Sequence, residues 1–194
     1  MNATTPRIYL AGPDVFLPDA ATVGALKSAV CLEFGLDGGF PLDNALALDH
    51  LTKTEQAREI SLSNESLMRS CSAVLANMTP FRGAGMDSGT AFEMGFMRAL
   101  GRPVFGYTNA VADYADRARA VRQLGFIDED FDGEEMDIED FGLAENLMLA
   151  VAVSETGPAL VRPAAALGSP SYDLSAFRQA VAATAEYFNA KGTA

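Results

Sequence analysis

A strand, a glycine-bearing loop, a helix and a second strand are predicted in close succession over residues 72–107. Residues 72–76 are apolar and short enough for a buried parallel strand, whereas residues 80–89 carry proline and glycine, which oppose regular structure. A helical segment follows, and an apolar strand resumes at residues 103–107. This pattern predicts a βαβ unit. Ligands of open α/β sheets bind beyond the carboxyl ends of the strands, so we expect a site at the loop before the helix.

Glu93, inside the helical part of this unit, has two interpretations. Residues 90–93 fit the S/T-x-x-E capping box, in which the glutamate reaches back to a free backbone N–H at the helix start. Alternatively, Gly89 and Gly95 are poor helix formers and indicate that another group approaches this helix closely. A packed strand and a ligand meet that requirement equally well, so the residue pattern leaves both interpretations open.

Short apolar strands and helical patterns alternate along the rest of the chain. They predict one domain over residues 1–194, an α/β fold whose mainly parallel sheet is covered by helices on both faces. The expected strands are residues 7–11 and 40–42, and residues 43–52 are expected as a loop over the pocket. The expected helices are residues 19–34, capped by Asp19, then 54–71, 112–124 and 174–190, with a helix or strand at 145–153 and an irregular segment at 157–173.

Two of these helices have predicted buried faces. On the helix at residues 19–34, the apolar positions recur at three- and four-residue steps, which is typical of a face that packs on a sheet. These positions are Val23, Leu26, Val30 and Phe34, and the positions expected to be buried on the helix at 54–71 are Ala57, Ile60, Leu67 and Met68.

Charge and composition argue against several classes of function. A formal net charge of −12 opposes binding to a nucleic acid polymer, which needs clustered Lys and Arg. The acidic run at residues 128–140 does not match the calcium-loop register, so we interpret it as a solvated loop. Cys31 and Cys71 lack metal-ligand spacing and are expected as reduced core thiols. His50 is the only histidine and is expected on a surface loop.

The sequence shows neither a membrane-spanning segment nor the pattern of a secretory signal. No run approaches the ~20 apolar residues of a membrane span, and residues 1–30 show no basic region followed by a long apolar run. We therefore expect a cytoplasmic protein. No dinucleotide-binding or P-loop glycine pattern follows the first strand, so neither a metal nor another cofactor is expected, and carboxylate chemistry remains.

The stretch Asp87-Ser-Gly-Thr-Ala-Phe-Glu93-Met-Gly95 resembles the signature of the nucleoside 2-deoxyribosyltransferase family. Three further stretches agree with it in order and spacing: residues 8–16, residues 64–76 and residues 141–149. Together they cover most of residues 7–150. The resemblance implies a flavodoxin-like three-layer fold. It also implies a role in nucleotide salvage, in which the 2-deoxyribosyl group of a 2′-deoxynucleoside is transferred to another purine or pyrimidine base.

The resemblance implies roles for three residues. Glu93 would be the nucleophile of a retaining double displacement through a glutamyl-deoxyribosyl intermediate, by the logic of retaining glycosidases. Tyr9 would orient that carboxylate. Asp87 would hold the 5′-hydroxyl of the sugar and repel a 5′-phosphate, although its residue type and position also suit a helix N-cap.

Asn146 and Met148 match an element that the family contributes to a neighbouring subunit's pocket, which implies a homo-oligomer, at least a dimer. Without the resemblance, Asn146 reads as a helix cap and Met148 as core. Asn64 stands where some family members have an aspartate thought to protonate the leaving base. An asparagine cannot supply that proton, which leaves Asp14, Asp43 or water as its source.

Loop residues complete the expected substrate contacts. Phe16, Phe81 and Met86 can cover the base or belong to ordinary packing, and Arg82 can contact the substrate or pin its loop to an acidic neighbour. The substrate-binding residues we predict are Asp14, Phe16, Asp43, Asn64, Phe81, Arg82, Met86, Gly89, Asn146 and Met148.

Two other functions remain open beside transfer. The chain can be an N-glycoside hydrolase of 2′-deoxynucleosides or their 5′-monophosphates, in which water replaces the acceptor base. It can also be a non-catalytic nucleotide-ligand binding module on the same fold. The sequence likewise leaves open whether purines alone, or purines and pyrimidines, are accepted.

Overall fold

The structure, a computed structural model, describes residues 5–43, 46–125, 130–131, 134–156, 159–166 and 168–192, without the side chains of residues 130, 131, 134 and 135. Several predicted segments therefore lie partly outside the described residues. These are the acidic loop at 128–140, the loop at 43–52 and the irregular segment at 157–173.

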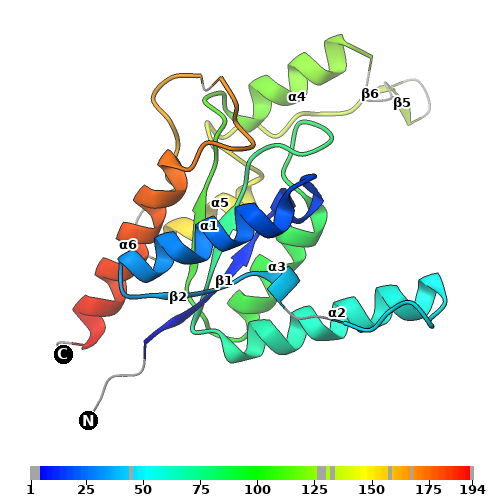
Figure 1. The fold of residues 1–194 in the computed structure, drawn as a ribbon. Coiled ribbons are helices and arrows are strands. Elements are labelled where there is room, and N and C mark those ends of the chain that lie inside the picture. The colour runs from blue at the N-terminus through cyan, green and yellow to red at the C-terminus, as the bar shows by residue number, and fades with distance from the viewer. Residues whose placement is uncertain are drawn as a thin grey trace.

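Four parallel strands form the central sheet (Figure 1): β1 (Arg7–Ala11), β2 (Asp37–Gly39), β3 (Ala73–Asn77) and β4 (Val104–Tyr107), in the order β2-β1-β3-β4. A parallel bridge between Tyr107 and Val161 continues the sheet beyond β4. This order is that of the flavodoxin-like doubly wound fold, and the predicted α/β class is confirmed. A second, two-stranded antiparallel sheet joins β5 (Asp130–Phe131) to β6 (Glu134–Glu135).

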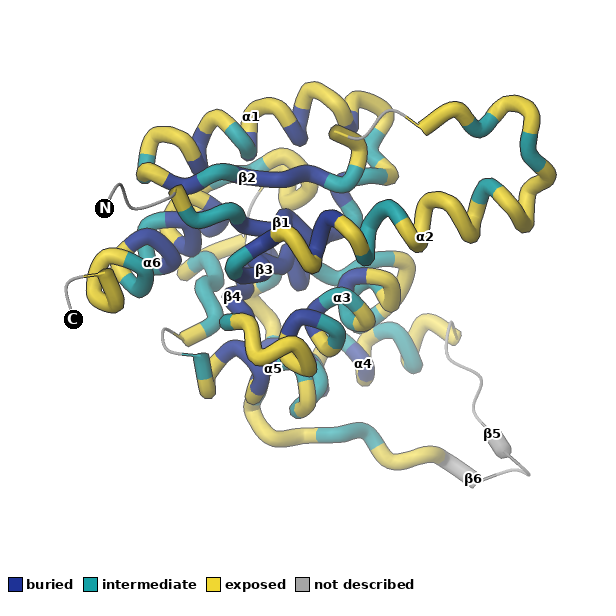
Figure 2. Tube along the Cα trace, turned by 90° about the horizontal axis from the view of Figure 1, so that it is seen from below, coloured by how far each residue is buried: buried dark blue, intermediate teal, exposed yellow. Residues whose placement is uncertain are grey.

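Helices cover both faces of the central sheet (Figure 2). α1 (Ala20–Glu33) and α6 (Ser175–Gly192) pack on one face, and α2 (Lys53–Ser70), α3 (Ser88–Ala99) and α5 (Leu147–Ser154) on the other. α4 (Tyr114–Gln123) lies toward the end at which the strands finish (Figure 1). Two 3₁₀ turns, η1 (Pro13–Phe16) and η2 (Pro41–Asp43), follow β1 and β2. Within the described ranges, no helix combines the length and the apolar character needed to cross a membrane.

Alternation along β1 divides the core into two clusters. Ile8 and Leu10 join the cluster under α1 and α6, whereas Tyr9 and Ala11 join the cluster under α2 and α3. Successive side chains of a strand point to opposite faces, so this register sends the Tyr9 side chain toward α3. All five residues of β3 are buried, as the continuous apolar run predicted for a central parallel strand.

The prediction of a strand at residues 40–42 was wrong. β2 lies at Asp37–Gly39, and Pro41 begins η2 instead. Pro41 has no N–H to donate to a β-ladder, whereas Gly38 allows β2 to pass close to α1. A Cβ atom at Gly38 would lie 3.0 Å from the Cys31 Sγ atom. Cys31 and Cys71 are buried and free, as expected for core thiols.

Three predicted buried positions are exposed. On α1, the Leu26 side chain is 52% exposed, although Val23 and Val30 are buried as predicted. On α2, Ala57 and Ile60 are exposed. Figure 2 shows the reason on α2: its amino-terminal half extends beyond the body of the molecule. Leu67 and Met68, near the other end of α2, are the residues of this helix that are buried.

The start of α1 differs from the prediction in the role of the Asp19 side chain. Asp19 occupies the N-cap position of α1, but its side chain makes no capping hydrogen bond. Its carboxylate accepts a hydrogen bond of 3.1 Å from the Tyr172 hydroxyl instead. Asp19 therefore connects the start of α1 to the segment that precedes α6.

A buried ion pair anchors the turn after β1. Lys27 Nζ lies 2.6 Å from Asp14 Oδ2, both side chains are 4% exposed, and Lys27 also donates to the Tyr107 hydroxyl at 2.7 Å. Asn77 Nδ2 donates to the same Asp14 oxygen at 3.1 Å. Burial lowers the pKa of Lys27, and the Asp14 charge opposes that shift. The pair thereby ties η1 to α1, β3 and β4.

Lys27→Met should destabilise the protein strongly, because it leaves the Asp14 carboxylate buried without its counterion. We expect a loss of about 3–5 kcal/mol in the free energy of unfolding, measured by urea denaturation. Lys27→Met combined with Asp14→Asn should recover much of that loss. Arg178→Met breaks an ion pair with Glu33 that solvent screens and should change stability little. A Lys27→Met variant as stable as Arg178→Met would contradict the conclusion that Lys27 is needed to compensate the buried Asp14 charge.

Candidate active site

A hydrogen bond between β1 and α3 marks the candidate active site. The hydroxyl group of Tyr9, whose side chain is buried, donates to Glu93 Oε1 at 2.5 Å. Glu93 is half-buried on α3, and the register of β1 points Tyr9 toward it. Two residues that are 84 positions apart in sequence are thus held in contact by the fold.

The pKa values of this pair differ from the ordinary values of both groups. Burial raises the pKa of Glu93 to about 7; the Tyr9 hydrogen bond lowers it, and the nearby charge of Asp87 raises it further. Burial also raises the pKa of Tyr9, as do the charge and hydrogen bond of Glu93. Tyr9 therefore stays protonated and donates, while Glu93 populates both its acid and its carboxylate form near neutral pH. A desolvated carboxylate of this kind is suited to act as a base or a nucleophile.

The Glu93 side chain lines a groove of about 400 Å³ between α2 and α3. Asn64 and Gly89, two residues predicted to bind substrate, lie on opposite walls of the same groove. Its volume is within the range of small-molecule sites. The groove is lined by Ala57, Ile60, Ser61, Asn64, Glu65, Met68, Gly89, Phe92 and Glu93.

Sequence reasoning missed several of these residues, although a helical signal was present. Ser61 and Ile60 precede Asn64 by three and four positions, and Ala57 precedes Ser61 by four, so all lie on one face of α2. Phe92, one position before Glu93, also lines the groove.

Asp87 is the N-cap residue of α3. Asp87 Oδ2 accepts hydrogen bonds from the Thr90 backbone N–H at 2.9 Å and from its hydroxyl at 3.0 Å. The capping-box interpretation of residues 90–93 was therefore wrong, because Thr90 lies one turn inside the helix and Glu93 bonds to Tyr9. A capping box does occur at the start of α2, between Thr52 and Glu55. Both capping bonds of Asp87 go to Oδ2, so Oδ1 can accept another donor.

A second group of predicted residues gathers at the carboxyl ends of β1 and β3. The rings of Phe16 and Phe81 stack with centroids 5.2 Å apart, and the Arg82 guanidinium lies over both rings. A cavity of about 100 Å³ lies beside them, with Asp14 and Ser171 among its walls. The Arg82 backbone has φ 56°, a conformation that residues other than glycine rarely adopt. The contacts that Arg82 makes within the described part of the chain are with these aromatic rings rather than with an acidic neighbour, and its contact with substrate stays a prediction.

Like Tyr9, Asp87 and Arg82, four further predicted residues line neither cavity. Asp43 Oδ2 accepts from the Phe40 backbone N–H at 2.8 Å and closes η2. Met86 is half-buried against the core under α3. Asn146 caps α5 through a 3.0 Å bond from the Met148 N–H to its Oδ1 atom, and the Met148 side chain is 72% exposed rather than core. In this chain, Asn146 and Met148 do not line the groove beside Glu93.

Comparison with known proteins gives one family and several relatives. The family model described as nucleoside 2-deoxyribosyltransferase matches residues 8–148. An uncharacterized protein of Schizosaccharomyces pombe is 32% identical over 125 residues, which cover 63% of this chain and 59% of the fungal protein. The match thus spans less than two thirds of that relative's length.

Two solved structures resemble the fold over nearly its whole length. The 2-desoxiribosyltransferase from Leishmania mexicana is 29% identical with a TM-score of 0.61, over 93% of this chain and 97% of that chain. A conserved protein from Enterococcus faecalis V583 is 18% identical with a TM-score of 0.55, over 93% of this chain and 99% of that chain. The second likeness supports the fold alone.

Tyr9→Phe should raise the pKa of Glu93, because it removes the hydrogen bond that favours the carboxylate form. The side-chain carboxyl carbon of Glu93 can be titrated by NMR, with its signal assigned by its loss in Glu93→Gln. We expect a pKa of about 7 in the unsubstituted protein and a higher value in Tyr9→Phe. A Glu93 pKa near the ordinary 4.5, or one that Tyr9→Phe leaves unchanged, would contradict this account.

Proposed function

The chain belongs to the nucleoside 2-deoxyribosyltransferase family, and on that premise we propose that it transfers the 2-deoxyribosyl group of a 2′-deoxynucleoside to a free purine or pyrimidine base. The observation that carries the proposal is the half-buried Glu93 carboxylate, held by Tyr9 and open to a groove of nucleoside size. The reaction reuses preformed bases, as in nucleotide salvage.

Glu93 is the nucleophile of this reaction. Tyr9 holds Oε1, so Oε2 attacks C1′ of the sugar; the C1′–O bond forms as the C1′–N bond to the base breaks. The acceptor base then attacks C1′ and releases the Glu93 carboxylate, and its ring N–H proton goes to the hydroxide that remains after water has protonated the leaving base. Two inversions at C1′ retain the original configuration, as in retaining glycosidases. The donated Tyr9 hydrogen bond stabilises the carboxylate in the free enzyme and again when the second step releases it.

The leaving base takes its proton from water in this scheme. Asn64 lines the groove and can hydrogen-bond the base, but its amide is not an acid. Asp14 is held in the buried ion pair with Lys27, and Asp43 closes a turn outside the groove. Of the three proton sources considered from the sequence, these contacts disfavour both carboxylates.

Asp87 recognises the 5′-hydroxyl group of the sugar. Its capping bonds use Oδ2, so Oδ1 is left to accept a hydrogen bond from the 5′-hydroxyl. The same negative charge disfavours a 5′-phosphate. The residues that can cover the base from the loops after β1 and β3 are Phe16, Phe81, Arg82 and Met86.

A second copy of this chain completes the groove. Phe92 on its wall is 60% exposed, Ile60 is 43% exposed, and Met148 at the start of α5 is 72% exposed. Large exposed apolar side chains, of which Phe92 and Ile60 line the groove, favour an interaction surface. We therefore place Asn146 and Met148 of each copy in the groove of its neighbour, which makes the enzyme a homo-oligomer.

Incubation with 2′-deoxyinosine and free adenine tests base exchange directly. We expect 2′-deoxyadenosine and hypoxanthine by chromatography, at a rate that falls as the pH drops below about 7, because protonated Glu93 cannot attack C1′. Glu93→Gln should lower the rate by more than about a thousandfold. Glu186→Gln, on the exposed side of α6, is the matched control and should retain activity.

Two outcomes of that assay would replace the proposal. Hypoxanthine without the new nucleoside indicates a hydrolase. Nucleoside binding without product, from deoxynucleosides and from their 5′-monophosphates, indicates a binding module.

Mixing two inactive variants tests the shared site. Glu93→Ala and Asn146→Ala should each lose base exchange, whereas mixed oligomers contain intact sites built from Glu93 of one copy and Asn146 of the other. For a dimer mixed in equal parts, about a quarter of the sites are intact. Each variant incubated alone is the control. Mixtures whose subunit exchange is verified by mass spectrometry and which still show no activity would rule out the shared site.

A further inference from the structure

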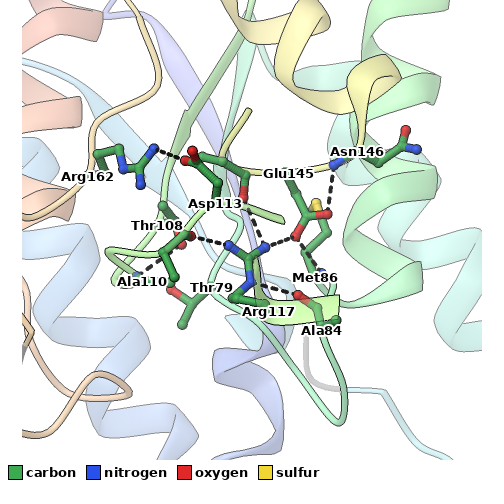
Figure 3. A network of polar contacts seen from close by, with 12 residues as sticks. Thr79, Ala84, Met86, Thr108, Ala110, Asp113, Arg117, Glu145, Asn146 and Arg162 are labelled. Atoms are coloured by element: carbon green, nitrogen blue, oxygen red, sulfur yellow. Dashed lines mark hydrogen bonds and ion pairs between the residues drawn. The ribbon is translucent and has the colours of Figure 1, made fainter. Parts of the chain in front are cut away.

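Glu145 is a buried carboxylate that joins two loops (Figure 3). Its side chain is 2% exposed, Oε1 accepts from the Met86 backbone N–H at 3.0 Å, and Oε2 accepts from the Asn146 backbone N–H at 3.0 Å. The loop at Met86 follows β3, and Asn146 begins α5. One carboxylate thus holds two segments that are about sixty positions apart in sequence.

Arg117, on α4, supplies the positive charge for Glu145 and fixes its surroundings. Arg117 Nη2 donates to Glu145 Oε1 at 2.9 Å and to the Ala144 carbonyl at 2.9 Å. Nε donates to the Ala84 carbonyl at 2.8 Å, and Nη1 donates to the Ala112 carbonyl at 2.6 Å. The planar fork of an arginine can reach several acceptors at once, which a lysine cannot reproduce.

The two held residues stand directly at helix starts. Met86 immediately precedes Asp87, the N-cap of α3, and Asn146 is itself the N-cap of α5. These two helices pack against each other. The Glu145 carboxylate therefore fixes where both helices begin, and with them the position of Asp87.

The segment that carries Asp87 needs such support. Residues 78–87 contain Gly83 and Gly85 and form no helix or strand, and a single backbone bond, from Phe81 N–H to the Gly85 carbonyl, closes their turn. Buried ion pairs add little net stability compared with apolar packing, because both charges must leave water. Positioning a loop accounts for the pair better than stability does.

We propose that Glu145, held by Arg117, is a positioning residue that sets Asp87 for recognition of the sugar's 5′-hydroxyl. The inference rests on the proposed function, in which Asp87 reads the 5′ end. Glu145 itself does not touch the substrate. It acts through the Met86 N–H, and the same carboxylate links the 5′-recognition loop to the segment that presents Asn146 and Met148.

The test compares two donors in base exchange, 2′-deoxyinosine and 2′,5′-dideoxyinosine, which lacks the 5′-hydroxyl. The ratio of their kcat/KM values measures recognition of that hydroxyl. Asp87→Ala should remove the preference for 2′-deoxyinosine. Glu145→Gln should lower the ratio roughly tenfold, since a small misplacement weakens the contact that depends on geometry. A loss that arises through the Asn146 segment affects both donors and cancels in the ratio.

Two further variants control the comparison. Arg117→Lys keeps the charge but cannot reach all four acceptors, so it should lower the ratio in the same direction even if Glu145→Gln folds poorly. Arg119→Gln removes an exposed arginine of the same helix, whose partners are Asp116 and Asp140, and should leave the ratio unchanged.

The outcomes separate this inference from the proposed function. No base exchange by the unsubstituted protein would overturn both. Base exchange with an equal loss for both donors in Glu145→Gln and Arg117→Lys would show that the pair only supports the fold, and would overturn the positioning role alone. A preference that survives Asp87→Ala overturns the positioning role as well, because Asp87 then does not read the 5′ end.

Discussion

The hydrogen bond from Tyr9 to Glu93 connects the sheet to the helix that follows β3, and it holds the carboxylate that lines the groove. Tyr9 reaches Glu93 because alternation along β1 sends residues 9 and 11 to the α3 side. Glu93 meets Tyr9 because Asp87 begins α3 and thereby sets the rotation of that helix. A change in the register of β1 or in the start of α3 by one residue would separate the two groups.

Three buried or half-buried carboxylates show how the fold distinguishes support from reactivity. Asp14 is paired with Lys27 and Glu145 with Arg117, so each charge is compensated by a cation. Glu93 has a neutral donor, Tyr9, and in the described part of the chain no cation contacts it. Burial raises the pKa of Glu93 to about 7, and it raises the pKa of Glu145 as well. Glu93 differs from Glu145 in that it has no cation partner among the described residues and lines the groove between α2 and α3.

Sequence reasoning found the framework and missed the long-range polar contacts. The βαβ unit and the strand at residues 7–11 are local patterns, and they were confirmed within a residue or two, whereas the strand expected at residues 40–42 was wrong. Lys27 and Arg117 carry no local signal, because their partners lie on other elements, as far as 80 positions away in sequence. The contact between Tyr9 and Glu93 followed from the family resemblance, since neither periodicity nor composition places the two residues together. Asp87 was correctly considered as a cap, whereas the competing box at Thr90 was wrong because α3 starts earlier.

The exposed face of α2 explains both an error and a property of the site. Ala57 and Ile60 were predicted to be buried, yet in a single chain they line an open groove. An apolar periodicity predicts that one face of a helix is covered, but it does not indicate whether the covering surface belongs to the same chain. If the proposed second copy covers Ile60 and Phe92, the prediction describes the assembly correctly and fails only for one chain. The groove beside Glu93 would then be closed to bulk water, apart from the water that protonates the leaving base, so transfer to a base would be favoured over hydrolysis of the glycosyl intermediate.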